Sequence, residues 1–208
     1  MIMRYPFGSG PFVTKPDKIS QKEEGLNRIS YLCIIKEKEQ NDTNDKKMTI
    51  VLNTLEESAV KEQIGTLITD AETEVVDTTD MKIAHCMGCN HCWLKTPGIC
   101  AIKDDYETIL KKLVGSENLW LVSDTRFGFI DWHGKRVMDR LMPLLNMYIE
   151  IRDGWERHEL RYHPLNVGLL YQGQGDQQLL EEWCERTAAN LGGHSLGVMK
   201  MKEGEPCM

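Results

Sequence analysis

Short apolar runs alternate with segments of helical periodicity along most of this chain of 208 residues. The apolar runs predict strands over 49–53, 72–77, 118–123, 165–171 and 195–201. Between them, apolar residues recur at helical spacing over 55–70, 106–113, 132–147 and 176–190. This alternation predicts an α/β fold in which a parallel five-stranded sheet lies between two helical layers.

Polar residues and glycines mark the ends of two predicted helices. Asp104 precedes the segment 106–113 as an acidic N-cap would, and Asp176 takes the same place before the last helix. Gly192-Gly193 ends that helix, because glycine adopts the left-handed conformation that closes a helical turn.

The first 47 residues lack the alternation and carry loop signals such as Gly8-Ser9-Gly10-Pro11. Residues 40–47 are polar throughout, and Met48 stands directly before the first predicted strand. We therefore predict an N-terminal extension and linker over 1–47, and one α/β domain over 48–208 with a cysteine loop inserted at 86–100.

Four of the seven cysteines fall in this loop, at Cys86, Cys89, Cys92 and Cys100. The spacing C-x2-C-x2-C-x7-C suits thiolates that wrap around one small centre, and Pro97-Gly98 predicts a turn that brings the fourth cysteine back. The pattern favours a [4Fe-4S] cluster. Zinc stays open, because His85 or His91 can replace a thiolate, and so do reduced thiols or a redox disulfide.

The same loop, followed by Lys103-Asp104-Asp105, resembles the cysteine motif of flavodoxin-like NAD(P)H-dependent FMN reductases and of the iron–sulfur flavoproteins among them. The matching pattern is Cys-x-Gly-Cys-x-x-Cys-Trp-x-Lys-Thr-Pro-Gly-x-Cys, and the resemblance covers roughly residues 48–202. It implies a flavodoxin-like, three-layer α/β/α doubly wound fold with FMN and a [4Fe-4S] cluster as cofactors. It also implies NAD(P)H or a redox protein as electron donor, and a homo-oligomer.

Further matches to that family lie downstream, at Lys135, Asp139-Arg140, Pro143, Arg161-Tyr162, Arg186 and Asn190. We interpret Asp139-Arg140 as an ion pair on a helix surface. For Arg161 a structural role and a contact with a substrate or a second subunit are both open.

Ligands of doubly wound sheets bind beyond the carboxyl ends of the strands, and we expect the cysteine loop near that edge. Together with this rule, the resemblance implies FMN contacts from Asn53, Thr54, Ser58, Thr125, Arg126, Phe127 and Gly128. The loop after the first strand departs from the family's glycine-rich phosphate loop, since it lacks glycine and carries Glu56 and Glu57. Each carboxylate costs a nearby phosphate on the order of 1 kcal/mol. The sequence assigns no catalytic residue.

Composition narrows the function classes. The net charge is −7, and an acidic body argues against nucleic acid as the main partner. No apolar run is long enough to span a membrane, and clustered cysteines without a signal pattern predict a cytoplasmic protein. The leading interpretation is a redox protein, an NAD(P)H-dependent FMN oxidoreductase or iron–sulfur flavoprotein. The alternative is a flavin-free subunit of the same fold, whose cysteine loop binds metal, senses redox state or serves as a partner-binding module.

Overall fold

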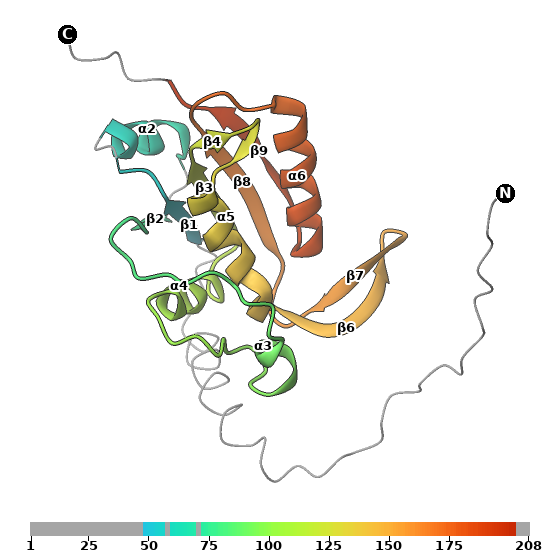
Figure 1. The fold of residues 1–208 in the computed structure, drawn as a ribbon. Coiled ribbons are helices and arrows are strands. Elements are labelled where there is room, and N and C mark those ends of the chain that lie inside the picture. The colour runs from blue at the N-terminus through green and yellow to red at the C-terminus, as the bar shows by residue number, and fades with distance from the viewer. Residues whose placement is uncertain (1–47, 57–58, 70–71, 203–208) are drawn as a thin grey trace, which may run out of the picture. The chain divides into compact units, whose positions relative to one another are not determined.

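The computed structural model describes residues 48–56, 59–69 and 72–202. The predicted extension 1–47 and Ser58 lie outside these residues, so both stay predictions. The elements, with η1 a 3₁₀ helix, are β1 (Met48–Asn53), α2 (Ala59–Leu67), β2 (Glu72–Asp77), α3 (His91–Leu94), α4 (Tyr106–Leu113), β3 (Asn118–Ser123), β4 (Thr125–Arg126), β5 (Phe129–Ile130), α5 (Trp132–Met138), η1 (Asp139–Leu144), β6 (Leu145–Arg152), β7 (Trp155–Leu160), β8 (Leu165–Tyr171), α6 (Gln177–Asn190) and β9 (Gly192–Lys200) (Figure 1).

The central sheet has five parallel strands in the order β2-β1-β3-β8-β9. Counted along the sheet alone, this is the order 2-1-3-4-5 of flavodoxin-like folds, and the order reverses between β1 and β3. The predicted fold is therefore confirmed. It also places the ligand-binding crevice of such folds beyond the carboxyl ends of β1 and β3.

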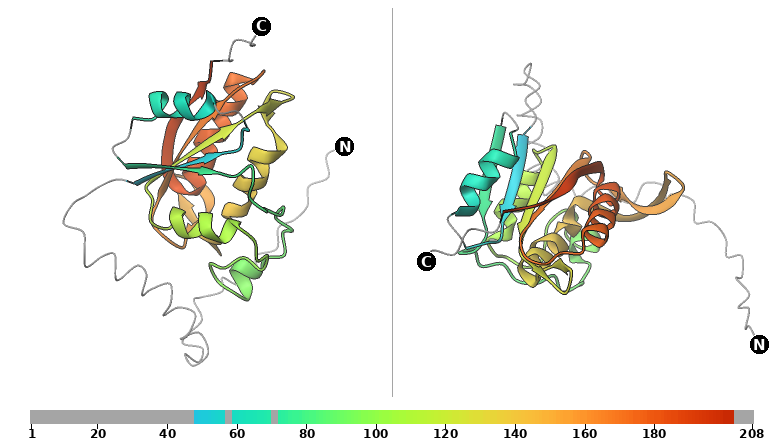
Figure 2. Two further views of the ribbon diagram at one scale, coloured as in Figure 1. Left: turned by 90° about the vertical axis from the view of Figure 1, so that its left-hand side faces the viewer. Right: turned by 90° about the horizontal axis from the view of Figure 1, so that it is seen from above.

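Side chains alternate between the two faces of the sheet along each strand, and helices cover both faces. Ile50 and Leu52 pack with the buried residues of α4, α5 and α6, whereas Val51 packs with Ile64 and Ile68 on the side of α2. Figure 2 shows α2 on one side of the sheet and α4 and α5 on the other. Among the helices that the structure describes, none is long and apolar enough to cross a bilayer.

The predicted helix over 132–147 is wrong in its second half. The α-helix ends at Met138, η1 follows, and β6 begins at Leu145. Pro143 lies inside η1, and it explains the break because it has no N–H to donate and its ring clashes with the preceding turn.

A hairpin of β6 and β7 follows, which the sequence reading missed. Its turn is Asp153-Gly154, with φ of 54° and 78°, the left-handed pair that a tight hairpin needs. An Asp-Gly pair between apolar runs was the available signal. The hairpin leaves the body of the domain in Figure 1.

Helix α6 agrees with its predicted ends. The Asp176 carboxylate accepts a hydrogen bond from the backbone N–H of Leu179, and Gly192 follows the C-cap Leu191 with a φ of 75°. Strand β9 begins at Gly192, three residues earlier than predicted. Cys184 is fully buried in the middle of this helix.

Asp104 and Arg140 form a buried ion pair. The guanidinium donates to both carboxylate oxygens, from Nη1 at 2.8 Å and from Nη2 at 2.9 Å. Asp105 occupies the N-cap position of α4 without a side-chain capping bond, and the Asp104 carboxylate accepts from the backbone N–H of Tyr106 at 3.2 Å, in keeping with the predicted capping role. The predicted Asp139–Arg140 surface pair is wrong, because Asp139 pairs with Lys135 while only 2% of Arg140 is exposed.

The surroundings of Asp104 favour its charged carboxylate over the protonated acid. Burial raises the pKa of Asp104, but hydrogen bonds from Arg140 and from the backbone N–H of Ala84 outweigh it, so the pKa lies below its usual value. Its contribution to stability is thus complete above the unfolded-state pKa of about 3.9 and is lost as the pH falls through the lower folded-state pKa.

We predict that Asp104→Asn lowers the free energy of unfolding by about 2 kcal/mol at neutral pH, because charge-assisted hydrogen bonds become neutral ones. The difference from the wild type should shrink in acid, as Asp104 of the wild type takes up its proton. Denaturant unfolding of both proteins over a pH series measures it. A difference that stays constant into acid would contradict the charged pair.

Candidate functional site

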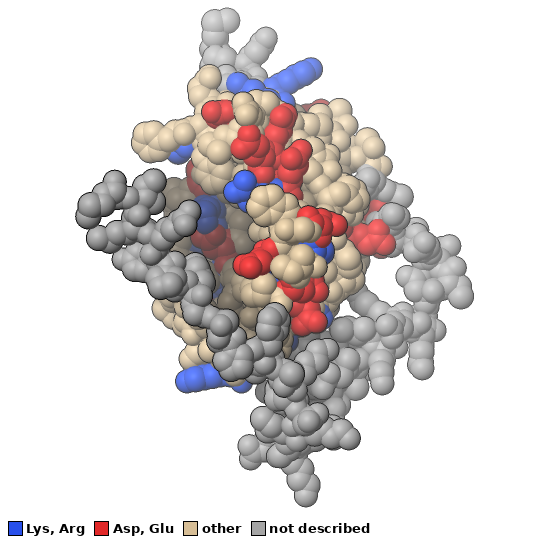
Figure 3. Space-filling model, turned by 90° about the vertical axis from the view of Figure 1, so that its right-hand side faces the viewer, with Lys and Arg blue, Asp and Glu red and all other residues tan. Residues whose placement is uncertain are grey.

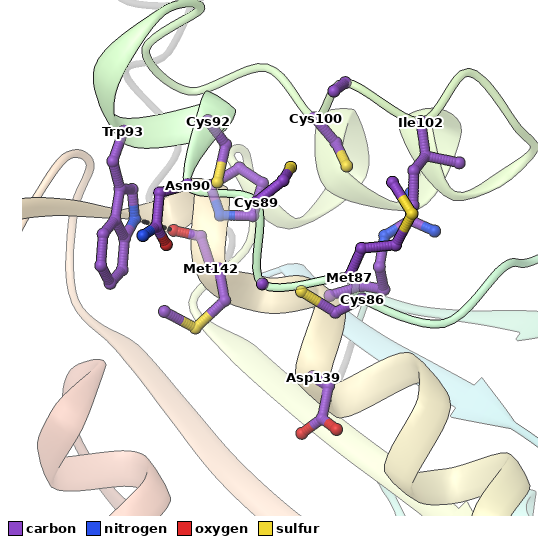
Figure 4. A pocket seen from close by; sticks show the side chains of 14 residues that line it. Cys86, Met87, Cys89, Asn90, Cys92, Trp93, Cys100, Ile102, Asp139 and Met142 are labelled. Atoms are coloured by element: carbon purple, nitrogen blue, oxygen red, sulfur yellow. Dashed lines mark hydrogen bonds between the residues drawn. The ribbon is translucent and has the colours of Figure 1, made fainter.

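The four cysteines of the loop open onto one cavity of about 290 Å³. Cys86, Cys89, Cys92 and Cys100 all line it, and the opposite wall comes from η1, through Asp139, Arg140, Met142 and Pro143. Figure 4 shows the four sulfurs around this opening. Residues that are 14 positions apart in sequence, Cys86 and Cys100, are thereby brought to one site.

Left-handed residues and a short helix shape the loop. Gly88, Asn90 and Gly98 have φ of 62°, 57° and 81°, and α3 begins directly after Asn90. The backbone N–H of Gly98 donates to the carbonyl of Cys92 at 2.9 Å. The predicted turn at Pro97-Gly98 is therefore present, and it returns the chain toward Cys92 before Cys100.

Trp93 anchors the loop to the rest of the domain. Its Nε1–H donates to the carbonyl of Met142 in η1 at 2.9 Å, and its ring stacks on that of His158 in β7 with centroids 4.5 Å apart. Leu94, the next residue of α3, is 59% exposed. The hairpin, rather than Leu94, covers the indole.

The second half of the loop packs on Arg161 and Tyr162. A Cβ at Gly98 would lie 2.8 Å from the Tyr162 hydroxyl oxygen and 3.0 Å from Cδ of Arg161, so only glycine fits here without displacement. Arg161 Nη2 also donates to the carbonyl of Leu145 at 3.4 Å. These contacts support the structural role that was one of the two left open for Arg161.

The cysteines differ in burial but share an electrostatic environment. Cys86 and Cys89 are exposed, whereas Cys92 and Cys100 are half-buried. Burial raises the pKa of Cys92, and the charges of Cys100, Cys86 and Cys89 raise it further. All four sulfurs therefore lie within electrostatic reach of one another, and an assembly of four thiolates needs positive charge nearby.

The donor set can be tested against the two kinds of metal centre. The five described cysteines are free thiols, and within the described residues no three Cys, His, Asp or Glu side chains converge as ligands of one ion. Zinc needs such convergence, because all its ligands bind a single ion at about 2.0–2.3 Å. A [4Fe-4S] cluster takes one thiolate on each iron, so four separate sulfurs around one cavity fit it better.

Neither candidate histidine lines the cavity. The His85 ring lies against Trp132 at the start of α5, with centroids 6.0 Å apart. His91 is the first residue of α3 and is half-buried there. A zinc site with a histidine in place of a thiolate has no support in this arrangement.

The loop predicted to hold the flavin ring is a tight hairpin beyond β3. Phe127 and Gly128 form its turn with φ of 53° and 82°, and the Phe127 side chain is fully exposed. A left-handed phenylalanine is uncommon and costs conformational free energy, which points to a functional position. Arg126 precedes the turn and is exposed as well.

Hydrogen bonds fix this hairpin to the loop that follows β8. The Thr125 hydroxyl donates to the carbonyl of Gln172 at 2.8 Å, and the backbone N–H of Asp176 donates to the carbonyl of Gly128 at 2.8 Å. Thr125 and Gly128 thus hold the hairpin in position. The turn itself, with Arg126 and Phe127, is left facing outward.

The residues predicted to hold the FMN phosphate are engaged within the protein. The Asn53 side chain bonds twice to Leu55, accepting from its N–H at 3.1 Å and donating to its carbonyl at 3.0 Å. The Thr54 hydroxyl donates to the carbonyl of Val122 at 2.8 Å. Glu56 is exposed, and Glu57 and Ser58 lie outside the described residues.

The cysteine cavity has a wall from η1, whereas the Phe127-Gly128 turn lies beyond the carboxyl end of β3. That the cysteine loop lies near this edge stays a prediction. After β2, two neighbouring residues contact the segment of α5 and η1. The carbonyl of Ala84 accepts a hydrogen bond from Arg140 in η1, and the His85 ring lies against Trp132 in α5. Trp132 and Arg140 are eight residues apart along α5 and η1, about 12 Å at the α-helical rise. The sequence did not predict that η1 forms a wall of the cysteine cavity, although the family matches at Asp139-Arg140 and Pro143 were a signal for it.

No model of a known protein family matches the sequence. The chain is 40% identical over 73 residues to an iron–sulfur flavoprotein of Methanocaldococcus jannaschii, a stretch that covers 35% of this chain and 37% of that protein. The resemblance to iron–sulfur flavoproteins is confirmed over that stretch, and the chain matches little more than a third of the relative's length.

A solved structure shares the fold. RosB with bound 8-demethyl-8-formylriboflavin-5′-phosphate is similar at a TM-score of 0.50 and 13% identity, covering 76% of this chain and 68% of RosB. An FMN-dependent NADH-azoreductase from Bacillus anthracis in complex with FMN reaches 0.47 at 14% identity, covering 74% of this chain and 86% of that one. At such identities the likeness to RosB shows the fold alone.

We predict that Gly98→Ala disrupts the cysteine loop more than Gly88→Ala. Both substitutions place a Cβ on a left-handed residue, which costs about 1–2 kcal/mol. Gly88 faces open space, whereas Gly98 abuts Tyr162 and Arg161, so overpacking should add about 1–3 kcal/mol at Gly98. Denaturant unfolding of the two variants measures the difference, and equal destabilisation would show that the packing against Arg161 and Tyr162 is loose.

Proposed function

We propose that this chain is a flavodoxin-like redox protein of the iron–sulfur flavoprotein kind, which transfers electrons between a nicotinamide or protein donor and an acceptor. The observation that carries the proposal is the cavity lined by all four cysteines of one loop, within a flavodoxin-like fold. The partial likeness to an iron–sulfur flavoprotein supports it.

Cys86, Cys89, Cys92 and Cys100 would hold a [4Fe-4S] cluster, and FMN would lie beyond the carboxyl ends of the strands. When bound, FMN supplies hydride and single-electron chemistry, and the cluster supplies single-electron transfer. The residues of the protein would hold the two cofactor-binding loops in place. Trp93 and Gly98 fix the cysteine loop against η1, β7 and Tyr162, and the hydrogen bonds of Thr125 and Gly128 fix the hairpin on which a flavin ring would rest.

The turn at Phe127-Gly128 is the part of the flavin edge that fits best. Its exposed ring and its outward-facing backbone, next to Arg126, offer a surface for a flat aromatic ligand. Asn53 and Thr54 fit less well, because their side chains already bond within the protein. A phosphate would therefore depend on Ser58 and on the N-terminal end of α2, as the resemblance implies.

One observation favours the alternative of a flavin-free subunit. The described part of the phosphate loop offers no unengaged hydroxyl or amide from Asn53 or Thr54, and Glu56 brings a negative charge. In that case the cluster alone would carry the redox function, or the loop would sense redox state or bind a partner. The flavin content of the purified protein separates the two candidates.

The donor would be NAD(P)H or a redox protein, and the functional unit a homo-oligomer in the cytoplasm. Free cysteines suit a reducing compartment. Acidic side chains run down the face that Figure 3 shows, where α6 carries Glu181, Glu182 and Glu185. Such a face repels polyanions, so nucleic acid is disfavoured as a partner.

The hairpin of β6 and β7 supports the proposed oligomer. Ile149 and Ile151 are more than half exposed, and Ile149 pairs across the hairpin with His158, the residue that stacks on Trp93. The two isoleucines therefore continue the face that borders the cysteine loop. A second copy packed there would bury them beside the cluster site.

We predict that anaerobically purified protein contains four iron and four sulfide per chain, and that Cys89→Ser loses most of both, because it lies in the middle of the cysteine run. Cys184→Ala should keep them, since Cys184 is buried in α6 against Val167. Iron, sulfide and FMN assays on the three proteins test this. Equal metal in the wild type and in Cys89→Ser would reject the cluster.

We also predict that Ile149→Glu/Ile151→Glu dissociates the oligomer, because it places two charges in an apolar interface. Size-exclusion chromatography with light scattering should show a monomer for this variant and a larger species for the wild type. Leu179→Glu, a matched change at an exposed leucine of α6, should leave the mass unchanged. An unchanged mass in the isoleucine variant would place the interface elsewhere.

A further inference from the structure

A buried guanidinium forms part of the wall of the cysteine cavity. Only 2% of Arg140 is exposed, and it lines the cavity together with the four cysteines. Its two terminal nitrogens are engaged by Ala84 and Asp104, which do not line the cavity. Nη1 donates to the carbonyl of Ala84 at 2.7 Å and to Asp104, and Nη2 donates to the other oxygen of Asp104.

The plane of this guanidinium is fixed as well. Its central carbon lies 4.8 Å from the centroid of the Tyr106 ring, and Tyr106 is itself fully buried with its hydroxyl donating to the carbonyl of Val137. A cation stacked on a ring and held by a carboxylate fork has little freedom to rotate. The direction of its remaining N–H is therefore set by the fold.

That remaining donor, Nε–H of Arg140, is buried and has no hydrogen-bond partner among the residues that the structure describes. Leaving a buried donor of a charged group unsatisfied is costly, about 1–3 kcal/mol or more. The other arginines whose Nε makes no hydrogen bond are only half-buried, at positions 136, 152, 157 and 161, and Nε of Arg152 lies 3.2 Å from the Glu150 carboxylate. Arg140 combines an unsatisfied donor with full burial beside four thiols.

The charge of Cys100 acts on the Arg140 guanidinium, which lines the same cavity. Burial lowers the pKa of Arg140, whereas the hydrogen bonds to Asp104 and the charge of a Cys100 thiolate raise it, and the net shift is upward. Asp139, the other charged residue of the wall, is paired with Lys135 and exposed. Arg140 is thus the cation that faces the cysteines across the cavity.

We propose that Arg140 donates its Nε–H to a cysteine thiolate or an inorganic sulfide of the cluster, and thereby raises the reduction potential of that cluster. The inference rests on the proposed function, since it needs a cluster on Cys86, Cys89, Cys92 and Cys100. This role for Arg140 is new, because the resemblance to the family gives Asp139-Arg140 as matching residues without a function toward the cluster.

The direction of the effect follows from charge. Reduction adds one electron to an already anionic cluster, and a fixed cation with an N–H directed at its sulfur stabilises the more negative form more strongly. Removing the donor and the charge should therefore lower the potential. Asp104 has the opposite sign, so neutralising Asp104 alone should leave the potential unchanged or raise it.

The test compares Asp104→Asn with Asp104→Asn/Arg140→Gln. The single variant keeps the Arg140 guanidinium without its carboxylate, and the double variant removes both charges of the pair. Redox titration of the anaerobically purified proteins with dithionite, followed by EPR, gives the potential of each. We expect the double variant to lose about tenfold in the reduction equilibrium constant relative to the single one, a shift of about 59 mV to lower potential for one electron. Arg136→Gln removes a cation of α5, the helix before η1, that does not line the cavity, and should shift the potential far less.

Equal potentials in the single and double variants, with the iron content of the wild type, would overturn the inference and leave the proposed function intact. Wild-type protein without iron and sulfide would instead overturn the proposed function. If the double variant does not retain iron, Arg140→Lys decides, because it keeps the charge opposite Asp104 and lacks Nε–H at that place. A lowered potential in the lysine variant supports the inference, and an unchanged one contradicts it.

Discussion

The buried pair of Asp104 and Arg140 is the interaction on which the cysteine site depends. It joins Asp104, four residues beyond the cysteine loop, to the 3₁₀ helix η1, which forms the far wall of the cavity. Arg140 also binds the carbonyl of Ala84, just before Cys86, so both ends of the loop are tied to one side chain. A buried ion pair is weak evidence for stability, but the loss of either partner leaves an uncompensated charge inside the protein. The cysteine loop and η1 are therefore held at a fixed distance from each other.

The two predicted cofactor sites lie at different places along the chain segment that runs from β4 to η1. The Phe127-Gly128 turn lies beyond the carboxyl end of β3, where doubly wound folds bind their ligands. The cysteine cavity lies at the far end of the segment formed by α5 and η1, beside the hairpin of β6 and β7. Because that hairpin exposes Ile149, Ile151 and Trp155, a neighbouring copy packed on these side chains would come close to the cysteine cavity.

The sequence predicted the elements that depend on local pattern and missed those that depend on tertiary contact. The five strands and the capped helix α6 follow from apolar runs and from Asp176 and Gly192. The turn at Gly98 followed from Pro97-Gly98, but its close fit against Tyr162 did not, since Tyr162 is distant in sequence. Arg140 was read as half of a surface pair, because nothing in a helical pattern shows that a charged residue turns inward toward Asp104. The cysteines were found together, whereas their position relative to the sheet depends on the path of residues 78–85.

A crystal of protein purified without oxygen, measured at the iron absorption edge, tests the central claim most directly. The account predicts iron in the cavity between the cysteine loop and η1, bonded to the sulfurs of Cys86, Cys89, Cys92 and Cys100. An anomalous map without iron there, or with iron bound by other residues, would contradict it.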